Sequence, residues 1–108
     1  MGWVVGTPSV DPTANAELAR FSPNEGGPYS LQVLITFRGP AGFDVIIEHI
    51  DEYGGIVAAH PFAVGLSPFI LPYIGPINFG KRHYFRVKNR NAVTGEAVAS
   101  IFWKEGAP

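Results

Sequence analysis

The sequence predicts an all-β sandwich of about seven short strands, and three observations support this fold class. Thirteen glycines and ten prolines divide the 108 residues into short apolar segments, which is typical of strands joined by turns. Several of these segments alternate apolar and polar residues with a period of two. Apolar residues make up 46% of the chain and charged residues 16%, which is enough apolar material for one buried core. A chain of this length is expected to form a single domain.

The two clearest expected strands cover residues 29–38 and 43–50. Every second residue is apolar over most of both segments, so one face of each strand is expected in the core. The sequence Gly-Pro-Ala-Gly at residues 39–42 predicts the turn between them. The residues expected to face inward are Leu31, Val33, Ile35 and Phe37, then Phe43, Val45 and Ile47, and in a later strand His83, Phe85 and Val87.

Two further apolar segments, residues 56–64 and 68–74, are rich in proline. Proline donates no hydrogen bond to a neighbouring strand and is tolerated mainly at sheet edges, so both segments are expected at the margins of a sheet. Residues 83–91 alternate again, and residues 97–103 form the last expected strand. A short helical signal of at most two turns lies at residues 13–21, where a threonine offers a candidate N-terminal cap.

The N-terminal 28 residues are more than one strand requires. A strand needs about 5 or 6 residues, whereas this segment continues through several prolines and glycines. We therefore expect an extended N-terminal arm and a first strand at residues 1–28, and the sandwich at residues 29–108. A small domain rarely shelters a tryptophan near its own chain end, so an arm lying along a neighbouring subunit would bury Trp3 there. An early strand followed by a long surface loop is the alternative.

Two segments resemble the fibronectin type III family, whose fold is an immunoglobulin-like sandwich. The alternation before residue 39 and the sequence Gly-Phe-Asp-Val-Ile-Ile at residues 42–47 resemble the second and third strands of the family. Residues 83–91, His-Tyr-Phe-Arg-Val-Lys-Asn-Arg-Asn, followed by Gly95, resemble its later pattern Tyr-x-Phe-Arg-Val-x-Ala-x-Asn-x-x-Gly. The resemblance covers residues 29–103 and implies a fold more than a particular activity.

Three positions depart from the family pattern. Ile35 stands where the family has a buried tryptophan, His83 where it has the corner tyrosine, and Phe79 where it has the turn proline. His83 is therefore expected to make the buried hydrogen bond for which the family uses tyrosine.

The sequence offers no motif for catalysis or cofactor binding. No serine lies in a Gly-x-Ser-x-Gly elbow, no glycine-rich phosphate loop precedes a helix, and cysteine is absent. His49, Asp51 and Glu52 are close enough in sequence to offer metal ligands, but a solvated turn is the favoured explanation. No run approaches the roughly 20 apolar residues of a membrane helix, and no secretory signal begins the chain. We expect a soluble, non-enzymatic protein without metal or cofactor.

Charge is balanced overall but unevenly distributed. Eight lysines and arginines face nine acidic residues, which excludes the strongly basic profile of a dedicated nucleic-acid binder. Period-two spacing nevertheless places a group of basic residues on one strand face, with Tyr84 among them: Arg82, Arg86, Lys88 and Arg90. In a fibronectin-like sandwich the adjacent strand carries Asp44 and Glu48 on its outer face, so cross-strand pairing is favoured over phosphate binding.

The low charge and a mean hydropathy of +0.13 predict a domain that buries part of its surface by assembling, as a homo-oligomer or on a scaffold. Small cysteine-free sandwiches resemble the decoration or cement proteins of tailed-phage capsids. This resemblance implies a structural subunit on the virion surface that binds and stabilises neighbouring shell subunits. The alternative is a protein- or carbohydrate-recognition module of a surface or secreted assembly, and nucleic-acid binding ranks third. The residues expected at the partner interface are Trp3, Val4, Val5, Leu34, Ile46, Tyr84, Arg86 and Lys88.

Overall fold

The computed structural model describes residues 1–39 and 42–107 and shows an all-β chain. Nine strands and no helix occur in this part of the chain, where about seven strands were expected. No segment there forms a helix with the length and apolarity that a membrane crossing requires. The strands are β1 (Gly2–Val5), β2 (Ser9–Val10), β3 (Glu17–Phe21), β4 (Gly27–Arg38), β5 (Phe43–Ile50), β6 (Ile56–Val64), β7 (Phe69–Phe79), β8 (Tyr84–Asn89) and β9 (Glu96–Glu105).

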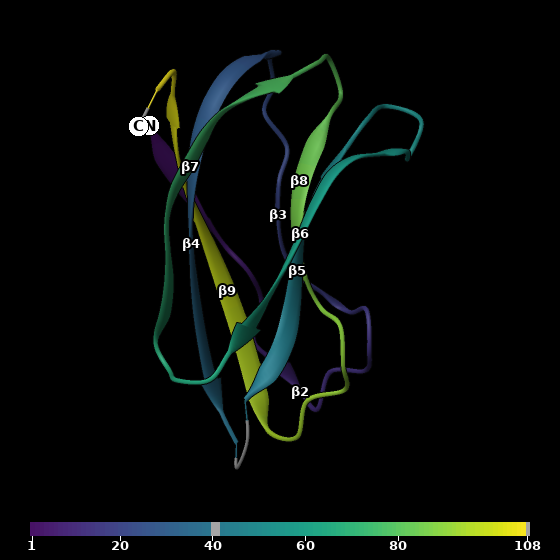
Figure 1. Ribbon diagram of the computed structural model, residues 1–108, viewed down its shortest axis with the longest axis vertical. Coiled ribbons are helices and arrows are strands. Elements are labelled where there is room, and N and C mark those ends of the chain that lie inside the picture. Colours follow the sequence, from purple (N-terminus) through teal and green to yellow (C-terminus); the bar gives the residue numbers. More distant parts are fainter. Residues whose placement is uncertain (40–41, 108) are drawn as a thin grey trace.

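The strands form two antiparallel sheets, an arrangement compatible with a β-sandwich (Figure 1). Sheet A has the order β1-β9-β4-β7, with β2 also paired to β9. Sheet B has the order β3-β8-β5-β6. The chain ends lie side by side (Figure 1), because Gly2 pairs with Trp103 near the end of β9.

The inward faces predicted from the alternation form the core, except for His83, which precedes β8 and is only half-buried. Leu31, Val33 and Ile35 of β4 are each 0% exposed, and Val45 of β5 and Val87 of β8 are equally buried. Phe37 is only partly buried, and it packs against the same cluster. The period-two pattern predicts these faces correctly because each strand buries one side only.

The proline-rich segments form the outer strands, as predicted. β6 lies at one edge of sheet B and β7 at one edge of sheet A. β7 continues to Phe79, beyond the expected end at residue 74. The turn predicted at residues 39–42 includes Pro40 and Ala41, which lie outside the described residues.

The prediction of a short helix at residues 13–21 is wrong, because residues 17–21 form the strand β3. Asn15 has φ of 65°, in the left-handed region, which ends any helical turn there. A bulge between Glu17 and Ala19 lets both Leu18 and Ala19 be buried. Pairing with β8 and burial in the core therefore override the weak local preference for helix.

The N-terminal segment is part of the sheets. Residues 1–28 contain β1, β2, β3 and the start of β4, and both β1 and β2 pair with β9. The Gly6 N–H still donates to the Ala99 carbonyl in β9, and the chain leaves sheet A only after β2; at Gly6 an added Cβ would collide with the carbonyl oxygen of Leu18 in β3. Residues 2–5 are therefore held by their own chain instead of extending as a free arm.

The places of β3 and β9 are unusual for an immunoglobulin-like sandwich. In such domains the last two strands share one sheet and the first two share the other. Here β9 pairs with β4 in sheet A although the preceding β8 lies in sheet B, and β3 pairs with β8. If β4, β5 and β8 correspond to the strands that show the fibronectin resemblance, β3 and β9 have exchanged places. Membership of that family stays a prediction.

Candidate interaction surface

The outer face of sheet A carries apolar side chains on all four of its main strands. β1, β9, β4 and β7 each present apolar side chains there, and we call this group the apolar face: Trp3, Val5, Leu34, Ile70, Tyr73 and Phe102. Strand alternation explains their direction, because their neighbours Val4, Leu71 and Trp103 pack against the core on the opposite side.

Strand register brings these side chains into two rows. In one row Val5 pairs with Ser100, Ser100 with Leu34, and Leu34 with Ile70. In the other, Trp3 pairs with Phe102, and Phe102 with Gln32. No charged residue belongs to either row. Four paired strands therefore hold these apolar side chains on one face, together with the uncharged polar residues Ser100 and Gln32.

Exposure within the apolar face is high for such large side chains. Trp3 is 68% exposed, Val5 60% and Ile70 57%. Scattered exposed apolar residues are ordinary, but a contiguous group on one sheet face marks an interaction surface. At its edge, the Lys104 ammonium lies 4.7 Å from the centre of the Tyr73 ring.

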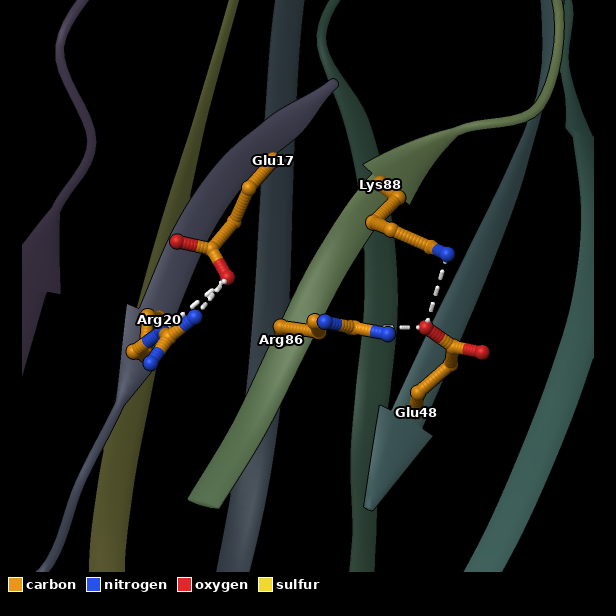
Figure 2. A network of polar contacts seen from close by, with 5 residues as sticks. All are labelled: Glu17, Arg20, Glu48, Arg86 and Lys88. Carbon is orange, nitrogen blue, oxygen red and sulfur yellow. Dashed lines mark hydrogen bonds and ion pairs between the residues drawn. The ribbon is translucent and has the colours of Figure 1, made fainter. Parts of the chain in front are cut away.

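The outer face of sheet B is charged and internally paired. Glu48 of β5 lies between two basic residues of β8, with Oε1 2.7 Å from Arg86 Nε and 3.0 Å from Lys88 Nζ (Figure 2). On β3, Arg20 Nη2 lies 2.8 Å from Glu17 Oε1. The Arg20 guanidinium also lies 4.1 Å from the centre of the Tyr84 ring.

The Glu48 network confirms the predicted cross-strand pairing of Arg86 and Lys88. The Glu48 side chain is only 4% exposed, and burial by itself would raise the pKa of its carboxyl. The hydrogen bonds from Arg86 and Lys88 outweigh burial and hold the pKa of Glu48 below its usual value. Both cations are therefore engaged within the sheet, which leaves them poorly placed to bind phosphate.

The predicted interface residues fall on different sides of the molecule. Trp3, Val5 and Leu34 belong to the apolar face, whereas Val4 packs against the core. The other four predicted residues lie on the outer face of sheet B, namely Ile46, Tyr84, Arg86 and Lys88. They do not form one surface with the apolar face.

Sequence reasoning missed three members of the apolar face. Phe102 lies between two other apolar residues, so the alternation of apolar and polar residues does not indicate which face of the sheet its side chain occupies. Ile70 and Tyr73 lie in a proline-rich edge strand with irregular register, where spacing does not define a face. The exposed side chains of β7 could be found only once its pairing with β4 was known.

A polar cluster lies between the end of β5 and the start of β8. His49 Nε2 is 3.0 Å from His83 Nδ1, and His83 Nε2 is 3.1 Å from Glu52 Oε2. His49 is 5% exposed, and its ring centre lies 4.6 Å from that of Phe79. His83 thus makes a hydrogen bond, as expected, but the contact is only part-buried. Within residues 1–39 and 42–107, no group of three or more His, Asp or Glu side chains has a geometry suited to a metal ion.

The stability of the protein is expected to fall as the pH drops below about 6.5, the ordinary pKa of histidine. Burial, and secondarily the nearby His83, lower the pKa of His49, while Asp51 opposes them weakly. The unfolded chain therefore binds a proton at His49 at a higher pH than the folded chain does. The stabilisation is complete above the unfolded pKa and is lost as the pH falls through the folded pKa.

Urea unfolding followed by tryptophan fluorescence between about pH 7.5 and pH 5 measures this effect. In His49→Gln the slope of stability against pH should be smaller over this interval. An unchanged slope in the variant would show that other groups cause the dependence.

Neither a protein-family model nor a curated protein matches this chain.

Proposed function

We propose that the protein is a non-enzymatic structural subunit that attaches to a protein assembly through the apolar face of sheet A. The observation that carries this proposal is the group of exposed and partly exposed apolar side chains that four strands place on one sheet face, in rows without a charged residue. The specific form of the proposal is a decoration, or cement, subunit on the surface of a virion shell.

The energetics of attachment favour this face. Fully burying a valine, leucine or isoleucine side chain contributes about 1.5–3 kcal/mol relative to leaving it exposed. Trp3, Val5 and Ile70 keep more than half of their surface exposed, so covering them would recover much of this contribution. The paired strands also hold these residues in place before binding, which limits the entropy lost on association.

The two outer faces suit different environments. On sheet B, Glu48, Arg86 and Lys88 neutralise one another in part and remain compatible with solvent. On sheet A the apolar face would contact the shell. A subunit that binds only the assembled shell stabilises that shell by mass action.

The recognition-module alternative has less support. It requires exposed aromatic residues gathered at one end of the sandwich, in loops such as residues 40–43 or 91–95. Phe43 is only 7% exposed, and Tyr53, at 89%, stands in a different turn between β5 and β6. Trp3 and Tyr73 belong to the apolar face, so the exposed aromatics favour that face over the loops.

Occupancy on purified particles tests the proposal. Virions prepared from the source that encodes the protein should contain it as a stoichiometric component by quantitative mass spectrometry. The double variant Leu34→Glu with Ile70→Glu should fold normally but lose at least ~90% of that occupancy, because it places two charges in the contact. The control is Ile46→Glu on the outer face of sheet B, which should attach like the wild type.

Either of two results would overturn this function. Absence of the protein from the particles would remove the virion role. Normal occupancy of the double variant together with loss in Ile46→Glu would move the attachment site to sheet B. Deleting residues 1–10 is less informative, because it also removes β1 and β2 from sheet A.

A further inference from the structure

The free edges of the two sheets are not equally protected against pairing with another strand. Natural proteins protect sheet edges with proline or charged residues. β7 carries Pro72 and Pro76, and β6 carries Pro61. β3 carries Glu17 and Arg20, whereas β1, with the sequence Gly-Trp-Val-Val, has neither proline nor charge.

The backbone of β1 offers hydrogen-bonding groups toward its free edge. The Gly6 N–H donates to the Ala99 carbonyl at 2.8 Å, so Gly6 faces β9. Successive residues of a strand direct their backbone groups to opposite sides, so those of Val4 also face β9. The N–H and C=O groups of Trp3 and Val5 therefore face outward, where no described strand pairs with them.

One register lets β1 pair with a second copy of itself over both of its outward-facing residues. Residues directly opposite in an antiparallel pair lie on the same face of the sheet. Trp3 and Val5 are on the apolar face and Val4 is on the core side, so Trp3 and Val5 must oppose residues of the same face. Both find such a partner within the four residues of β1 only when Trp3 opposes Val5 of the second copy. Val4 then opposes Val4 at the two-fold axis. In this register the outward N–H and C=O groups of both Trp3 and Val5 meet those of the second copy.

We propose that the protein forms a two-fold symmetric dimer by antiparallel pairing of β1 with β1 of a second copy. The two copies of sheet A become one continuous sheet, and their apolar faces become one surface. Each exposed Trp3 then lies beside Val5 of the other chain. The proposal goes beyond the attachment function, because the dimer needs no shell to form.

A four-residue strand makes a small contact, so the dimer is expected to be weak, with a dissociation constant on the order of 100 µM or above. Sedimentation equilibrium of the purified protein from about 10 µM to 1 mM covers this range. The average mass should rise with concentration from 11.7 kDa toward twice that value.

Val5→Pro is the sharpest variant, because it removes an outward N–H without removing a bond to β9. It should remain monomeric across the whole range. The matched control is Val10→Pro in β2: the Asp11 N–H donates to Gly95, so the Val10 N–H also points away from β9, but outside the proposed contact. Val10→Pro should dimerise like the wild type.

Circular dichroism shows whether Val5→Pro keeps the fold. If proline disturbs the fold, Val5→Lys provides a second variant. Val5 is 60% exposed, so the lysine is tolerated in the monomer but places a charge at the edge. A wild type that stays monomeric at every concentration overturns the proposal. So does a dimer that survives in Val5→Lys yet is lost in Leu34→Glu with Ile70→Glu, since that result indicates face-to-face contact. Particle occupancy is measured separately, so failure of either proposal leaves the other standing.

Discussion

Replacing Phe85 by alanine is expected to lower the free energy of unfolding by about 3–5 kcal/mol, the usual cost of removing a buried phenylalanine side chain. Phe85 is 2% exposed and lies in β8, the strand between β3 and β5 of sheet B. It pairs with Phe21 on one side and His49 on the other. The loss combines the transfer free energy of the ring with the cost of the cavity it leaves.

The adjacent residue supplies the control for this prediction. Tyr84 is also aromatic but faces outward, where its ring contacts the Arg20 guanidinium. Tyr84→Ala should lower the free energy of unfolding by only about 1 kcal/mol, the usual contribution of an exposed cation–π contact. Urea unfolding of both variants gives the comparison. Equal losses would contradict the assignment of alternate residues of β8 to opposite faces.

Alternation predicted the core because a strand buried on one face permits no other register. A shift by one residue in β4 would turn Leu31, Val33 and Ile35 to solvent and bring polar side chains inside. The same constraint fixes Val45 and Val87. Proline placed β6 and β7 at the sheet edges for an equally local reason, since it cannot donate to a second neighbour.

Spacing could not predict which strands pair across the chain. The sequence Ala-Val-Ala-Ser-Ile-Phe-Trp at residues 97–103 is apolar on both sides, and nothing in it selects β4 over β8 as its neighbour. Spacing also could not predict the partner of the N-terminal residues, because that partner, β9, lies almost the full chain length away. At β3, the bulge beside Leu18 breaks the period-two pattern and leaves a weak helical signal in its place.

The candidate site was predictable only in part, for the same reason. Trp3 and Leu34 stood out as apolar residues without a place in the core. Their grouping with Phe102 and Ile70 depends on the order of strands in sheet A, which is a property of the whole fold. The ion pairs of Glu48 with Arg86 and Lys88 were easier to predict, because the adjacent strands β5 and β8 carry opposite charges at period-two spacing.

The second large effect is expected at Glu48, where glutamine should lower the free energy of unfolding by about 3 kcal/mol, the low end of the cost of breaking a buried ion pair. The substitution preserves the shape of the side chain but leaves Arg86 and Lys88 without their counter-charge. Their side chains are 24% and 16% exposed, so they regain some hydration, which places the loss at the low end.

Glu17→Gln is the matched control, because Glu17 and Arg20 form an ion pair whose side chains are 35% and 45% exposed. Pairs of this kind contribute about 0–1 kcal/mol. Urea unfolding at neutral pH should therefore separate the two variants clearly. If Glu48→Gln lowers the free energy of unfolding by no more than Glu17→Gln does, Glu48 does not hold the two cations of β8. Arg86 and Lys88 would then be available for an acidic or phosphate-bearing partner.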